Sequence, residues 1–236
     1  MDRPDLARRA VTEALGTFVL VFAGCGAIVA DARTHGGLGA VGVALVFFLV
    51  LVALISAGGH VSGAHYNPAV TVALAVGRHF PLREAGTYIA AQATGAIAAG
   101  LVLLAAWPDK TAHLGATVPT VGVGTAFLYE ALMTAFLVFV VFAVATDTRA
   151  VGVVAALAVA ATVGCDALFG GPLTGASMNP ARSLGPALAS GTWTDFWLYL
   201  AAPLLGAVAG GSAYTYVRGS GPAAEPDGLA AVGQTA

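Results

Sequence analysis

The chain has 236 residues, of which 58% are hydrophobic and only 9% are charged. Soluble domains carry roughly 25% charged residues, so this composition indicates a membrane protein. The net charge of −2 and the presence of a single lysine exclude the basic surface that nucleic-acid binding requires, and no nucleic-acid partner is expected.

Six apolar stretches are long enough to cross a membrane, since a spanning helix needs about 20 mostly apolar residues. They are residues 10–30, 38–57, 85–106, 121–146, 150–169 and 196–217. The stretches are rich in glycine and alanine, and small residues let helix backbones approach closely in lipid. The candidates for such close crossings are Gly16, Gly95, Gly206 and Gly210.

Two pairs of segments repeat along the chain. Residues 62–71 and 174–183 share Gly, Ala, Asn, Pro and Ala at an offset of 112. Residues 13–22 and 130–139 share a Glu-Ala-Leu pattern with further matches at an offset of 117. These offsets predict two homologous halves, each with three spanning helices and one short segment. Because three spans per half is an odd number, the second half must be inserted upside down.

The repeat defines the expected domain organisation. One transmembrane domain covers residues 1–217, with its first repeat over about 1–110 and its second over about 111–217. Residues 218–236 are rich in Gly, Pro and Ala, and we expect them to form a disordered tail.

A short helix is predicted to start at the Asn-Pro-Ala box of each half. Asn67 and Asn179 are good helix N-caps, and the following proline suits the first helical position. The ten residues from Pro68 onward would make about 15 Å of helix, which is half the hydrocarbon thickness. The second helix starts at Pro180, and we expect Pro186 to kink or shorten it.

The residues before each box are predicted to be non-helical, over 58–66 and 170–178. Such backbone is tolerated at membrane depth only where it is buried in protein or lines a water-filled cavity. Inverted repeats with interrupted helices place a site near the membrane midplane. Arg182 lies in the first turn of the second short helix, where the helix dipole opposes a cation and does not explain it.

The basic residues predict the orientation. With a cytoplasmic N-terminus, seven arginines lie inside and only two basic residues lie outside, in agreement with the positive-inside rule. We therefore expect both termini to be cytoplasmic. The inside residues are Arg3, Arg8, Arg9, Arg78, Arg83, Arg149 and Arg218, and the outside residues are Arg33 and Lys110.

Several ionisable or thiol side chains lie within the apolar stretches. Glu13 and Glu130 are functional suspects by default, because carboxylates are costly inside a membrane. Asp166 either faces water at the interface or attracts solutes in an outer vestibule. Cys25 and Cys165 have neither metal-ligand nor disulfide spacing, and we expect buried structural thiols. Neither a metal site nor a cofactor is predicted.

Residues 59–71 (GHVSGAHYNPAVT) and 178–183 (MNPARS) resemble the aquaporin, or major intrinsic protein, family. The likeness covers about residues 8–217 and includes both glutamate windows and residues 88–92. The resemblance implies an all-α membrane channel with six transmembrane helices and two re-entrant half-helices. It also implies a homotetramer in the plasma membrane or a bacterial inner membrane.

The resemblance implies roles for individual residues. The N-termini of the two half-helices would meet at the midplane, where Asn67 and Asn179 can donate hydrogen bonds to a passing solute and the helix dipoles repel cations and protons. A filter narrower than the midplane would lie on the outer side of the two boxes. His65 would line the cytoplasmic half of the pore. The filter residues are Phe47, Ala167, Ala176 and Arg182, and the residues that would support the re-entrant loops are Glu13, Glu130 and Gln92.

The filter residues bear on the choice of solute. Water-selective members of the family tend to carry a histidine where this chain has Ala167. Two alanines beside one phenylalanine and one arginine imply a wider opening, which favours glycerol, urea or uncharged metalloid acids in addition to water. Ser183 and Ala187 resemble the water-channel type instead, and residues 171–178 resemble the plant nodulin-type channels.

Three functional classes were compared. A passive channel is favoured, and a strictly water-selective aquaporin is the alternative. An ion-coupled carrier would also use inverted repeats, but its site would need ionisable groups at the midplane, where this chain has two neutral asparagines. An intramembrane enzyme is rejected, because the sequence has no His-Glu-x-x-His and no spacing that suggests a catalytic pair.

Overall fold

The computed structural model describes residues 4–147, 149–150 and 154–219, and within these ranges every regular element is helical. Six helices are long and apolar enough to span a membrane, which confirms the predicted fold class. They are α1 (Leu6–Arg33), α2 (Gly39–Ser62), α4 (Leu82–Ala106), α5 (Val123–Ala145), α6 (Ala155–Thr174) and α8 (Leu198–Arg218). All but the first two residues of the expected disordered tail lie outside the described ranges.

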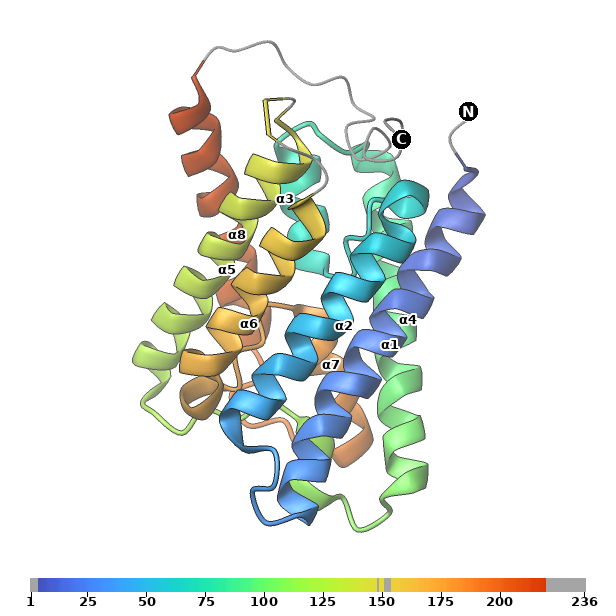
Figure 1. The fold of residues 1–236 in the computed structure, drawn as a ribbon, viewed down its shortest axis with the longest axis vertical. Coiled ribbons are helices and arrows are strands. Elements are labelled where there is room, and N and C mark those ends of the chain that lie inside the picture. Colours follow the sequence, from blue (N-terminus) through green and yellow to red (C-terminus); the bar gives the residue numbers. More distant parts are fainter. Residues whose placement is uncertain (1–3, 148, 151–153, 220–236) are drawn as a thin grey trace.

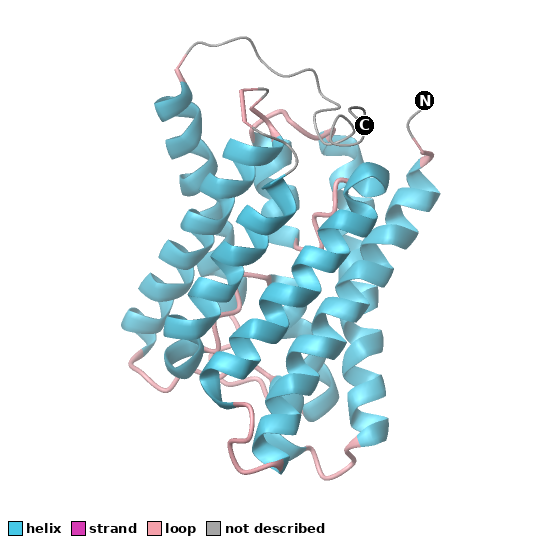
Figure 2. Ribbon diagram, viewed as in Figure 1, coloured by secondary structure: helices cyan, strands magenta, loops and turns pink. Residues whose placement is uncertain are grey.

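The long helices form a tilted bundle around two short ones (Figures 1 and 2). In the bundle α1 packs along α4, α5 along α8, and α2 along α6. The short helices are α3 (Pro68–Val76) and α7 (Pro180–Ser190), one in each half of the chain. Figure 1 shows α3 running toward one end of the bundle and α7 toward the other, as expected for inverted repeats.

The non-helical segments are shorter than predicted. The helices α2 and α6 continue to Ser62 and Thr174, so only residues 63–67 and 175–179 precede the short helices. Both α2 and α6 end where a glycine takes the left-handed conformation, with φ of +88° at Gly63 and +86° at Gly175. The helix ends are set by these C-terminal glycines, and the glycines earlier in the predicted segments stay helical.

The two short helices begin as predicted. The Asn67 side chain accepts a hydrogen bond from the Ala69 backbone nitrogen (2.8 Å), and the Asn179 side chain caps α7 in the same way. The expectation that Pro186 shortens α7 is wrong, because α7 has 11 residues and α3 has 9, while the alternative expectation of a kink stays a prediction. Tight packing holds α7 in place: a Cβ added at Gly185 would lie 2.1 Å from a carbonyl oxygen of α4. Tertiary packing here outweighs the hydrogen bond that proline removes.

Glycines mark the close helix crossings. A Cβ added at Gly95, Gly206 or Gly210 would lie 2.1 Å from a backbone carbonyl oxygen of the neighbouring helix, which confirms the predicted crossings. Gly16 differs, since its close neighbour is the ring of Tyr66 and not a helix backbone. The small residues therefore bring α1 against α4 and α5 against α8 at backbone distance.

Ion pairs tie the elements together at the end of the bundle where α1 begins and α8 ends (Figure 1). Arg9 donates to Glu84 (2.8 Å), which ties α1 to α4. Arg149 donates to Asp147 (2.6 Å), and Arg218 lies 3.3 Å from the same carboxylate. The hydrogen bonds from Arg149 hold the pKa of Asp147 well below its usual range, so this carboxylate stays charged between its two arginines.

Gly210→Ala is expected to destabilise the bundle, because the added methyl group would meet the Ala135 carbonyl oxygen of α5. Overpacking of this kind lowers the thermal midpoint by about 5 °C. Thermal unfolding of the detergent-solubilised protein measures the change. Gly86→Ala is the matched control, because its methyl group meets nothing within 4 Å. Equal midpoints for the two variants would show that the α5–α8 crossing tolerates a side chain.

Candidate functional site

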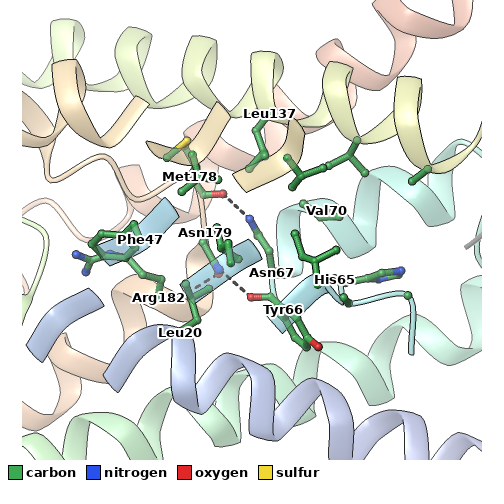
Figure 3. A pocket seen from close by; sticks show the side chains of 18 of the residues that line it. Leu20, Phe47, His65, Tyr66, Asn67, Val70, Leu137, Met178, Asn179 and Arg182 are labelled. Carbon is green, nitrogen blue, oxygen red and sulfur yellow. Dashed lines mark hydrogen bonds between the residues drawn. The ribbon is translucent and has the colours of Figure 1, made fainter. Parts of the chain in front are cut away.

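A cavity lies at the centre of the bundle, where the two short helices begin (Figure 3). Residues from both halves of the chain line it. Six of the seven predicted pore residues are among them, namely Phe47, His65, Asn67, Ala176, Asn179 and Arg182. Much of the remaining wall is apolar and is provided by Leu20, Leu51, Val70, Leu74, Leu137, Val141, Val159 and Val163.

The two asparagines link the re-entrant loops to each other. Asn67 donates from Nδ2 to the Met178 carbonyl oxygen (2.8 Å), and Asn179 donates from Nδ2 to the Tyr66 carbonyl oxygen (2.8 Å), as Figure 3 shows. In both residues Oδ1 accepts from the short helix that follows. Since an amide nitrogen carries two hydrogens, each asparagine has a second N–H for a solute in the cavity.

Glu13 accepts the hydrogen bonds of the first re-entrant loop. Its Oε1 accepts from the Ser62 hydroxyl (2.7 Å) and the His65 backbone nitrogen (3.0 Å). Its Oε2 accepts from the Tyr66 backbone nitrogen (2.7 Å) and the Gln92 amide (2.8 Å). Glu13 is fully buried, so it supplies acceptors to backbone that has no water or helix partner.

Glu130 has the same position in the second half, with one donor fewer. Its oxygens accept from the Thr174 hydroxyl (2.7 Å) and from the backbone nitrogens of Ser177 (2.9 Å) and Met178 (2.8 Å). In this part of the repeat Tyr88 matches Tyr199, because their hydroxyls donate to the equivalent carbonyl oxygens of Ser62 and Thr174. The position four residues on, which is Gln92 in the first half, is Pro203 in the second and has no side-chain donor. Each re-entrant loop is therefore held by hydrogen bonds to one buried glutamate, and Glu130 accepts one bond fewer than Glu13.

Arg182 and Phe47 lie together at one end of the cavity (Figure 3). The Arg182 guanidinium carbon is 5.4 Å from the centre of the Phe47 ring, within the range of a cation–π contact. Nη1 donates to the Gly115 carbonyl oxygen (2.7 Å), while Nε and Nη2 have no hydrogen-bond partner within the described ranges. Arg182 is only 2% exposed and lines the cavity, so these two nitrogens are buried beside it without a protein acceptor among the described residues.

The remaining predicted pore residues differ in their placement. Ala176 lines the cavity, but Ala167 is partly buried and is not among the lining residues. His65 lines the cavity wall nearer α3, and its Nδ1 lies 3.0 Å from the Thr71 hydroxyl. Its ring also packs edge-on against Phe80. His65 is thus held in a fixed orientation by its neighbours.

Asp166 and Cys165 differ from expectation. Asp166 is fully buried, and neither of its oxygens has a hydrogen-bond partner among the described residues, so it faces neither the interface nor a vestibule. The matching position in the first half is Leu54. Cys165 is exposed because it lies on the outer side of α6, while Cys25 is buried as predicted.

The sequence reasoning missed Gly115, whose carbonyl oxygen binds Arg182. The segment between the two halves has no counterpart in the repeats, and its glycine carries no motif. Tyr66 and Met178 were also missed as acceptors for the asparagine amides. Their place directly before each Asn-Pro-Ala box was the available signal.

Comparisons with known proteins agree on one family. The family model described as "Major intrinsic protein" matches residues 1–214. "Aquaporin NIP1-1" from Zea mays is 44% identical over 211 residues, covering 89% of this chain and 75% of the relative. "Nodulin-26" from Glycine max is 44% identical over 211 residues, covering 89% and 78%.

A solved structure is similar over most of both chains. It is described as the "aquaglyceroporin from Plasmodium falciparum", and the likeness has a TM-score of 0.76 at 28% sequence identity. It covers 89% of this chain and 96% of that chain. Sequence and fold comparisons thus lead to the same family.

Glu130→Gln is expected to destabilise the protein, because an amide NH2 would replace an oxygen that faces backbone N–H donors. An unsatisfied buried donor costs about 1–3 kcal/mol. Asp166→Asn is the contrasting variant, since that carboxyl group has no bond to lose within the described part of the chain. Thermal unfolding should show a lower midpoint for Glu130→Gln and an unchanged or higher one for Asp166→Asn. A lower midpoint for Asp166→Asn than for Glu130→Gln would contradict the hydrogen bonds assigned to Glu130.

Proposed function

The chain belongs to the major intrinsic protein family, and we propose that its pore conducts water together with glycerol-like polyols, urea or metalloid acids, by diffusion down a gradient. The observation that carries the proposal is the mixed character of the cavity. Apolar side chains form much of its wall. Among the described residues, Arg182 Nε and Nη2 have no hydrogen-bond partner, and each box asparagine has a second N–H beyond the one that binds the opposite loop.

This arrangement suits a small neutral solute with hydroxyl groups. Its hydroxyl oxygens can accept from Asn67, Asn179 and Arg182 in turn, while its carbon atoms pass along the apolar wall. A desolvated hydroxyl is costly unless it is hydrogen-bonded, so a line of donors lowers the barrier to passage. Near Arg182 the wall is lined by Phe47 and Ala176, and the position where water-selective members of the family tend to carry a histidine is Ala167, which does not line the cavity. These features support polyol passage over strict water selectivity.

The same residues are proposed to exclude ions and protons. The N-termini of α3 and α7 both begin at the cavity, and each carries a partial positive charge. Arg182 adds a full positive charge at the end near Phe47. A cation that enters would meet this field without compensating acids, since the nearby Glu13 and Glu130 are engaged by loop donors. A carrier that couples transport to ions is not favoured by two neutral asparagines.

We further propose one channel domain over residues 1–217, assembled as a homotetramer in the cell membrane with both termini cytoplasmic. The protein is an integral membrane protein. The outer faces of its helices are apolar; on α1, for example, Val11, Leu15, Val19 and Phe22 are exposed. Such faces suit lipid or another copy of the chain. Diffusion through a pore requires neither a cofactor nor a catalytic residue.

The proposal is tested by stopped-flow light scattering on proteoliposomes. Vesicles with the purified protein should shrink faster than protein-free vesicles under sucrose, and they should then re-swell rapidly under glycerol. Fast shrinkage without re-swelling would establish a strictly water-selective pore and overturn the polyol proposal. Slow responses in both assays would overturn the channel proposal as a whole.

Arg182→Val is expected to raise proton and cation leak while water permeability changes little, because the variant loses the charge but leaves the pore open. Leak is measured with a pH-sensitive dye inside the same vesicles under a potassium diffusion potential. Arg83→Gln is the control, since Arg83 is an exposed residue at the start of α4. Ion exclusion that survives in Arg182→Val would refute the role proposed for this arginine.

A further inference from the structure

The segment that connects the two halves contains a left-handed turn, the 110–115 turn, which contacts the filter arginine. Gly115 ends this turn, and its carbonyl oxygen accepts from Arg182 Nη1 at 2.7 Å. This is the hydrogen bond that fixes the Arg182 guanidinium within the described residues, because Nε and Nη2 have no partner there. The position of the filter charge therefore depends on the position of one loop oxygen.

The turn has an unfavourable backbone conformation. Lys110, Ala112, His113 and Leu114 have φ values between +50° and +55°, and Gly115 has φ of +77°. Residues with a Cβ rarely adopt this region, and they persist in it only where the surroundings determine the conformation. Contacts with residues outside the turn must therefore stabilise this backbone conformation.

The contact that holds it most firmly is the side chain of Leu114. Leu114 is fully buried in a cluster formed by α1, α4 and α7, whose other members include Val21, Leu103 and Ala181. Apart from the bonds to the Gly115 oxygen, the side-chain polar contacts of the turn lie nearer the surface, such as Lys110 with the Ser190 carbonyl oxygen (2.9 Å) and His113 with the Thr192 hydroxyl (3.1 Å). Exposed polar contacts contribute little compared with a buried leucine.

Helix α1 packs directly against Gly115 and leaves its backbone little room to move. A Cβ added at Gly115 would lie 2.7 Å from the Cβ of Cys25 on α1, so the turn rests directly on that helix. The Cys25 thiol donates to the same Gly115 oxygen at 3.7 Å. Once Leu114 is inserted, Gly115 is pressed against α1 with its oxygen directed to Arg182.

We propose that Leu114 is a positioning residue for the selectivity filter. Its insertion into the cluster of α1, α4 and α7 holds the Gly115 oxygen against Arg182 and thereby sets how much space the filter leaves for a polyol. The inference rests on the proposed function, since it concerns the selectivity of the same pore.

Loss of this anchor has a defined consequence. Without the Gly115 oxygen, the Arg182 guanidinium must find another acceptor, and the accessible ones are water molecules in the cavity. A mobile guanidinium in the pore obstructs a polyol more than it obstructs water, which can serve as its hydrogen-bond partner. The ratio of glycerol to water permeability should therefore fall.

Leu114→Ala is the test, with both permeabilities measured in proteoliposomes. The expected result is a fall in the glycerol-to-water ratio of about three- to tenfold, the size typical of changes that act through a neighbouring residue. Leu114→Met, which conserves volume, should retain the ratio. Leu198→Ala is the matched control, because it truncates another fully buried leucine that packs in a different cluster, with Ala126 and Tyr199. A similar fall in that control would show a general packing effect and overturn the inference.

Cys25 provides a readout of the turn itself. In a Cys165→Ala background Cys25 is the remaining thiol, and its alkylation by a small maleimide should be slow in the parent and faster after Leu114→Ala. Faster alkylation with an unchanged permeability ratio would overturn the inference, and so would an unchanged rate. If Leu114→Ala does not fold, Leu114→Val is used, with a smaller shift expected in the same direction. A parent that conducts neither solute refutes the proposed function, whereas a conducting parent with an insensitive Leu114 refutes only this inference.

Discussion

The structure depends on how a membrane protein satisfies backbone N–H groups that belong to no helix. At membrane depth such groups have no water to bind, and each unpaired one is costly. Glu13 and Glu130 solve this problem in the two halves, each accepting from two consecutive backbone nitrogens of a re-entrant loop. With the loops held in this way, the short helices can begin in the middle of the bundle, and their dipoles and capping asparagines can face one cavity. The hydrogen-bonding groups that face the cavity are thus placed there by the bonds that the two glutamates make to the loop backbone.

The two halves share this scaffold, but the filter uses them unequally. At the midpoint each box asparagine binds the other loop, so the contacts there are nearly symmetric. Elsewhere the symmetry is broken: the position of Arg182 in the second half is Val70 in the first, and the position of Gln92 in the first half is Pro203 in the second. The half that carries the filter charge therefore has the loop with fewer donors to its glutamate. A duplicated scaffold can be altered on one side for selectivity because the other side retains the full set of bonds.

Sequence rules succeeded where the cause is local or repeated. Capping by Asn67 follows from its own backbone position, and the crossings at Gly206 and Gly210 follow from the absence of side chains. The rules failed where the cause lies on another element. Pro186 does not shorten α7, because α4 packs against that helix. The exposure of Cys165 depends on which side of α6 faces outward, a property that a uniformly apolar helix does not reveal in its sequence.

The proposed filter combines a residue that the sequence predicts with a contact that the sequence does not predict. Its charge comes from a repeated box, but the oxygen that orients this charge comes from the segment between the halves, which is not duplicated. That segment reaches the proposed filter through a left-handed turn with several strained residues, held by packing against α1, α4 and α7. Strain of this kind persists at sites that the surrounding structure over-determines. In the proposed arrangement Leu114 acts on selectivity without touching the solute, through the strained turn and the Gly115 oxygen.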